Sequence, residues 1–102
     1  MILERNGNKW KLTAGKDFHH ETRISKADAI EFRKRCEKFF KGVLLGNPEQ
    51  CWDTKLHTYM LMLAEGKCYI HINKRPYGDW DDDEIVTRIS LHEMFEFLIG
   101  VK

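Results

Sequence analysis

Hydrophobic and polar residues alternate over short stretches at the start of the chain, a pattern typical of strands with one buried face. Residues 2–5 and 9–13 alternate in part and flank Asn6-Gly7, a dipeptide that tolerates the positive φ angles of a tight turn. Residues 18–24 alternate as well. The pattern therefore predicts a hairpin followed by a third strand.

After Ser25 the apolar residues recur at spacings of three and four, which predicts an amphipathic helix that begins at Lys26. The Ser25 hydroxyl can accept a hydrogen bond from the backbone amide of Asp28, and the Asp28 carboxylate favours the positive end of the helix dipole. Gly42 or Gly46 is expected to end the helix. Its predicted core face consists of Ala29, Phe32, Cys36, Phe39, Phe40 and Val43.

Residues 48–63 fit two patterns. The segment 47–50 resembles a helix start, and the apolar residues that follow it could form a helical stripe. The Glu65-Gly66 turn and the apolar run around Ile70 favour a hairpin instead, with strand from about Leu56 onward. We predict the hairpin and keep the helix as the alternative.

The last part of the chain predicts a strand over residues 84–89 and a helix over residues 91–99. Ser90 is the expected N-cap of this helix, with Glu93 at its third position. The expected core face of the helix consists of Phe95, Leu98 and Ile99, with Leu91 at the same edge.

The sequence Thr-Arg-Ile-Ser occurs twice, at residues 22–25 and 87–90, each time before a predicted helix. Glu-Phe follows both copies at the same offset, and a glycine turn with an aromatic segment precedes both. This internal similarity predicts two related units, about 1–46 and 54–102, within one domain. The expected fold class is α+β: a duplicated β-β-β-α unit whose antiparallel sheet has two helices packed on one face.

The composition, 42% hydrophobic and 32% charged, is that of an ordinary globular protein. No apolar run approaches the length of a membrane span and no signal peptide is evident at the first residues, so we expect an intracellular, cytoplasmic protein with no membrane partner. The three cysteines lack a C-x-x-C pair, and we expect them to be small buried residues rather than a disulfide framework.

The charge is unevenly distributed. Residues 1–57 contain 12 Lys and Arg against 8 Asp and Glu, whereas residues 58–102 contain 5 against 8. Much of the acidity lies in residues 79–84, which predict either a solvated loop or a recognition loop for a basic protein surface. The candidate partner-binding residues are Tyr77, Trp80, Asp81, Asp82 and Asp83, with Trp80 as the anchor.

Residues 25–33, with Phe39-Phe40 and the closing Leu45-Gly46, resemble the helix of the PUR repeat, a family that binds single-stranded nucleic acid. Residues 90–98 are similar but lack the arginine after Glu-Phe, and residues 59–72 resemble a PUR hairpin. In that family each repeat is a set of antiparallel strands followed by a helix, and two repeats intertwine into one domain. The related single-strand-binding transcriptional coactivators build the same shape from two chains. Family units usually have four strands and a more basic sheet.

The resemblance implies that ligand binds on the sheet face away from the helices. With Trp10 and Leu12 in the core, alternation turns their lysine neighbours outward, and Tyr69 and His71 project outward in the same way. Such a surface would pair its cations with phosphates and stack bases on Tyr69, with little sequence specificity. The candidate nucleic-acid-binding residues are Lys9, Lys11, Arg23, Tyr69, His71 and Arg88.

Motifs for catalysis or metal binding are weak. His92 and Glu96 lie one helical turn apart without an evident third ligand, and His19 and His20 alternate across a strand and cannot chelate one ion. We therefore expect no enzyme activity, no metal and no cofactor. The alternative function is a small protein-binding inhibitor or adaptor, of the kind that phages and mobile elements carry, acting through the acidic Trp80 loop. Free strand edges leave a homodimer possible.

Overall fold

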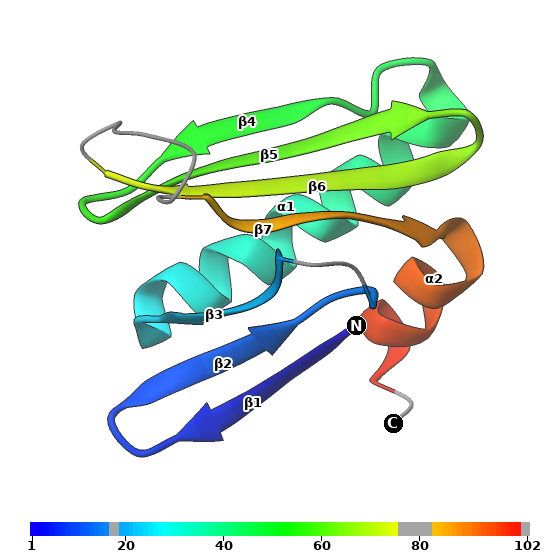
Figure 1. The fold of residues 1–102 in the computed structure, drawn as a ribbon. Coiled ribbons are helices and arrows are strands. Elements are labelled where there is room, and N and C mark those ends of the chain that lie inside the picture. The colour runs from blue at the N-terminus through cyan, green and yellow to red at the C-terminus, as the bar shows by residue number, and fades with distance from the viewer. Residues whose placement is uncertain (17–18, 76–82, 101–102) are drawn as a thin grey trace.

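The computed structural model describes residues 1–16, 19–75 and 83–100, and within these ranges the chain forms seven strands and two helices (Figure 1). The elements follow the order β-β-β-α-β-β-β-β-α. In chain order they are β1 (Ile2–Asn6), β2 (Lys9–Thr13), β3 (His19–Ile24), α1 (Lys26–Leu45), β4 (Gln50–Asp53), β5 (His57–Ala64), β6 (Lys67–Lys74), β7 (Asp83–Ser90) and α2 (Leu91–Ile99).

The seven strands form one antiparallel sheet in the order β1-β2-β3-β7-β6-β5-β4. Strands β1 to β3 form one meander, and strands β4 to β7 form the other. The two meanders meet where their last strands, β3 and β7, lie side by side. That junction is short, because β3 and β7 pair only through His19 with Val86 and His20 with Ile85. From Glu21 onward, β3 has no paired residue in β7.

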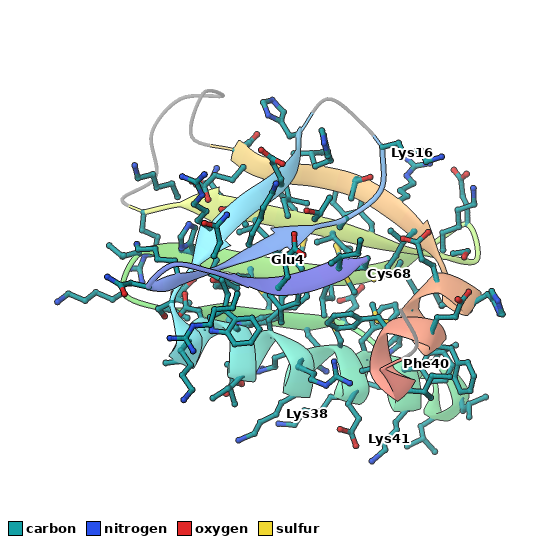
Figure 2. All side chains as sticks on the ribbon, turned by 90° about the horizontal axis from the view of Figure 1, so that it is seen from below. Glu4, Lys16, Lys38, Phe40, Lys41 and Cys68 are labelled. Atoms are coloured by element: carbon teal, nitrogen blue, oxygen red, sulfur yellow. The ribbon has the colours of Figure 1, made fainter. Side chains whose placement is uncertain are left out.

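Both helices cover the same side of the sheet, with the strands above and the helices below in Figure 2. Phe32 of α1 lies at the centre of the core, with its ring centroid 6.1–6.3 Å from those of Trp52, Tyr59 and Phe97. The rings of Trp52 and Tyr59 stack on each other at 4.9 Å. Burying such rings is the main favourable contribution to folding.

The two Thr-Arg-Ile-Ser copies adopt the same local structure. In each copy the threonine and isoleucine are buried at the end of a strand, and the serine caps the following helix. Ser25 Oγ accepts from the Asp28 amide at 3.1 Å, and Ser90 Oγ accepts from the Glu93 amide at 3.0 Å. The predicted helix starts are therefore confirmed, and α1 ends at Gly46, which has a φ of 83°.

The duplicated β-β-β-α unit is not confirmed, because four strands rather than three precede α2. Residues 50–53 and 57–64 are strands, so the helical alternative for residues 48–63 is wrong. Asn47 and Pro48 do not start a helix; Asn47 instead donates its backbone N–H to the carbonyl of Gly42 at 2.9 Å and closes the end of α1.

The predicted core face of α2 is correct only for Leu91 and Leu98, which are half-buried against the core. Met94 and Phe97 are the buried residues, whereas Phe95 and Ile99 are 44% and 53% exposed. Phe95 packs on Phe40 of α1, with ring centroids 5.8 Å apart.

In α1, Phe40 and Val43 are half-buried at the edge of the core and the other four predicted residues are buried. Cys36 and Cys68 are buried as expected, but Cys51 is exposed. Among the described residues, no helix combines the length and hydrophobicity that crossing a membrane requires.

Candidate nucleic-acid interface

The outer face, meaning the side of the sheet turned away from the helices, carries all six predicted nucleic-acid-binding residues. Their positions follow from strand alternation, because Leu12, Ile24, Ile70, Ile72 and Ile89 are buried on the helix side. The register then places Lys9 and Lys11 on β2, Arg23 on β3, Arg88 on β7, and Tyr69 and His71 on β6.

Tyr69 and His71 form the aromatic part of this face. Their rings lie edge to face, with centroids 6.3 Å apart. Opposite them on β5 the register places Met62 and Met60, and opposite His71 on β7 it places Val86, all three half-buried. Sequence reasoning missed these three apolar neighbours, although their alternation with the buried residues of β5 and β7 was the available signal.

The cations of the outer face lie mainly on one side of β6, on strands β2, β3 and β7. Lys11 contacts Glu21 at 3.4 Å and Arg88 contacts Glu65 at 3.7 Å. All four side chains are at least about one-third exposed. Such ion pairs contribute at most about 1 kcal/mol to stability, so a phosphate can replace the carboxylate in either pair. Among the described residues, neither Lys9 nor Arg23 has an ion-pair partner.

Asp83, predicted as part of an acidic recognition loop, is instead the first residue of β7. Its Oδ1 atom accepts from Asn73 and lies 3.0 Å from Nε2 of His71. Burial tends to raise the pKa of Asp83, but the hydrogen bonds from His71 and Asn73 outweigh it and the pKa lies below the ordinary 3.8. The prediction of Asp83 as a loop residue is wrong because strand pairing with Asn73 continues to this point. Tyr77, Trp80, Asp81 and Asp82 lie outside the described residues.

A β-bulge directs the next residue, Glu84, toward the helix side. In the pairing of β6 with β7, Ile72 lies opposite Ile85 and Asn73 lies opposite Asp83, so Glu84 is an additional residue on β7. Bulges commonly re-aim a side chain in this way. Its Oε2 atom accepts a hydrogen bond from the Thr22 hydroxyl and lies 2.7 Å from Nε2 of His57.

Behind Glu84 lies a buried polar network that sequence reasoning missed. His57 is only 5% exposed, and its Nδ1 atom lies 3.9 Å from Oδ2 of Asp28. The same Asp28 oxygen accepts hydrogen bonds from Tyr59 Oη at 2.7 Å and from Thr54 Oγ1 at 2.8 Å. The network therefore connects α1 to strand β5, to β7 and, through Thr22, to β3.

The surroundings fix the protonation states of two members of the network. Burial raises the pKa of Tyr59, and the hydrogen bond to Asp28 raises it further, so the phenol keeps its proton and donates. Partial burial tends to raise the pKa of Glu84, but the hydrogen bonds from His57 and Thr22 and the charge of His57 outweigh it, so this pKa lies below 4.5. Glu84 is therefore ionised at neutral pH and acts only as an acceptor.

A cleft of about 510 Å³ opens where β3 and β7 stop pairing. Its walls come from β2, β3 and the beginning of β7, and they combine cations with carboxylates. The lining residues are Lys11, His19, Glu21, Thr22, Arg23, Asp83 and Glu84. Because Lys11 and Arg23 belong to both the cleft and the outer face, the two form one continuous surface.

The remaining candidates for chemistry are separate from this surface. His92 and Glu96 contact each other at 2.8 Å on the exposed side of α2. His19 and His20 pair with different residues of β7 and lie on opposite faces of the sheet. Within the described part of the chain, no group of three or more His, Cys, Asp or Glu side chains is placed to hold a metal ion.

Comparison with known proteins gives no match, whether to a family model, to a curated protein or to a solved structure.

Proposed function

We propose that this protein binds single-stranded nucleic acid on the outer face of its sheet. The observation that carries the proposal is the position of Tyr69 and His71 on an open sheet face beside cations from three neighbouring strands. A single strand can place its phosphates on the basic strands and turn its unstacked bases toward Tyr69 and the methionines of β5. Aromatic stacking beside a positively charged groove is the usual way in which proteins bind single strands without strong sequence preference.

A duplex fits this surface less well. Its bases are stacked on one another and paired, so they cannot stack on Tyr69. The proposal therefore includes a preference for single strands over duplexes of the same sequence.

We infer a binding role rather than a catalytic one. The pair of ionisable groups beside the cleft, Glu84 and His57, includes a histidine that is 5% exposed, so a substrate has little access to its ring. A general base must come within hydrogen-bond reach of the proton that it removes.

The direct test is fluorescence anisotropy of a labelled single-stranded oligonucleotide, with a duplex of the same sequence as the control. We expect tighter binding to the single strand and a loss of affinity as salt rises from about 50 to 200 mM, because bound phosphates release counterions. Absence of binding at the lower salt concentration would refute the proposal. The protein-binding role of the acidic loop would then take its place.

A further inference from the structure

We propose that the cleft between β3 and β7 receives a ribose of the bound strand and recognises its 2′-hydroxyl, so that the protein prefers RNA to DNA. This inference rests on the proposed function, because the cations that would hold the flanking phosphates are those of the outer face.

The size and position of the cleft suit one nucleotide unit of a strand on the outer face. Its volume of about 510 Å³ is within the range of roughly 300–1,000 Å³ that small-ligand pockets occupy. Lys11 and Arg23 stand at its border with the outer face, where they can bind phosphates on either side of an inserted sugar.

Two carboxylates of the cleft are each held through one oxygen. Oε2 of Glu84 bonds with Thr22 and His57, and Oδ1 of Asp83 bonds with His71 and Asn73. Each carboxylate is thus fixed in direction through one oxygen, and each lines the cleft that a ligand would enter.

Both carboxylates are held in place before any ligand arrives. The β-bulge fixes the direction of Glu84, and the buried His57 ring holds its carboxylate. His71 and Asn73 hold Asp83 in the same manner. Groups that are ordered beforehand lose little conformational entropy when they bind.

The combination of charges selects the chemical class of the ligand. Phosphates are attracted to Lys11 and Arg23 but repelled by the ionised Glu84, so the group that meets Glu84 must be a neutral donor. A ribose hydroxyl between two phosphates meets both conditions, and a carboxylate that accepts from a ribose 2′-hydroxyl is a familiar feature of nucleotide sites. Deoxyribose has no such donor, and the 2′-hydroxyl is the group by which proteins distinguish RNA from DNA.

The test compares four single strands of one base sequence that differ only at the 2′ position: RNA, DNA with uracil in place of thymine, 2′-fluoro and 2′-O-methyl. Fluorine keeps an RNA-like sugar shape but cannot donate a hydrogen bond. We expect RNA to bind about tenfold or more tightly than the other three, as for one hydrogen bond to a charged group. Base amino groups are the same in all four strands and cannot produce this difference.

Glu84→Gln provides the matching change in the protein, and Asp53→Asn is its control. Asp53 is an exposed carboxylate on β4, three strands from β7, so its substitution removes the same charge away from the cleft. We expect Glu84→Gln to reduce the ratio of RNA to DNA affinity severalfold and Asp53→Asn to leave the ratio unchanged. If Glu84→Gln fails to fold, the four strands measured with the unaltered protein decide the question alone.

The outcomes separate this inference from the proposed function. Equal affinity for RNA and DNA, or 2′-fluoro binding as tight as RNA, overturns recognition of the 2′-hydroxyl and leaves single-strand binding intact. Binding of none of the four strands overturns both.

Discussion

The hydroxyl of Tyr59 lies 2.7 Å from Oδ2 of Asp28, which joins the middle of β5 to the first turn of α1 inside the core. Tyr59 is fully buried. A largely buried carboxylate requires donors, and Asp28 has a phenol and a threonine hydroxyl on the same oxygen. This contact and the outer face lead to the following predictions.

Tyr59→Phe removes the donor and leaves the ring. We expect the free energy of unfolding to fall by about 1–3 kcal/mol, because the Asp28 carboxylate loses one of its donors in a buried environment. Urea unfolding measures the change. Tyr69→Phe is the matched control, since its ring lies half-buried on the outer face, and it should leave stability nearly unaltered. Equal stability of the two variants would show that the Tyr59 hydroxyl contributes nothing.

The pKa of Glu84 predicts an acid-dependent loss of stability. Because the folded-state value lies below the ordinary 4.5, ionised Glu84 stabilises the fold above about pH 4.5, and this contribution disappears as the pH falls through the lowered value. Glu84→Gln cannot titrate, so its stability should depend less steeply on pH in that interval. Urea unfolding of both proteins between about pH 7 and pH 3 tests this. Identical slopes would contradict the assignment, and Asp53→Asn serves as the control for an exposed carboxylate.

The cations of the outer face should determine the salt dependence of binding. Each phosphate contact removed is expected to reduce the slope of log affinity against log salt by about 0.7 for a single strand. Lys9→Gln and Arg23→Gln should each do so. Lys38→Gln should leave the slope unaltered, because Lys38 points away from the sheet on the far side of α1 (Figure 2). If Lys38→Gln reduced the slope as much as Lys9→Gln or Arg23→Gln does, the net charge of the protein, and not the outer face, would govern binding.

Tyr69 should contribute through its ring. Tyr69→Ala is expected to weaken binding of a single strand by about 1–3 kcal/mol, the usual contribution of one stacked base, and Tyr69→Phe should preserve most of the affinity. Anisotropy titrations at one salt concentration give both values. If the alanine variant binds as tightly as the unaltered protein, bases do not stack at this position.

Gly42→Ala should destabilise the fold although alanine ordinarily favours a helix by about 1 kcal/mol over glycine. A Cβ atom at this position would lie 2.4 Å from the Asn47 carbonyl oxygen and 2.7 Å from Pro48 Cα, both backbone atoms. We expect a loss of about 1–3 kcal/mol in urea unfolding, as for other overpacked sites. Lys38→Ala, at an exposed position of the same helix, is the control. A gain in stability for Gly42→Ala would show that the segment after α1 moves aside freely.

The local features of the fold were predictable from the sequence. Both helix starts follow from a serine with an acidic residue three positions later, and the outward positions of Lys9, Lys11 and Tyr69 follow from alternation with buried or half-buried neighbours.

The predictions failed where the spacing of apolar residues fits more than one structure. Residues 91–99 are apolar at six of nine positions, so their spacing does not decide which side of α2 faces the sheet. The four-residue strand β4 directly follows Pro48 and Glu49, which also fit a helix start.

Long-range features could not be predicted in this way. Simple alternation with Ile85 places Glu84 on the outer face, and only the bulge opposite Ile72 and Asn73 reverses its direction. The contact of Asp28 with Tyr59 joins residues that are 31 positions apart, and no local spacing encodes it.

The junction between β3 and β7 also bears on how the chain acquires its structure. Strands within each meander are joined by nearby residues, so their hairpins can form early, whereas Thr22 and Glu84 must close a separation of 62 residues. The cleft exists only once that closure is complete, since its walls come from both meanders. A newly synthesised chain therefore remains without this cleft until the last strand before α2 has emerged and docked.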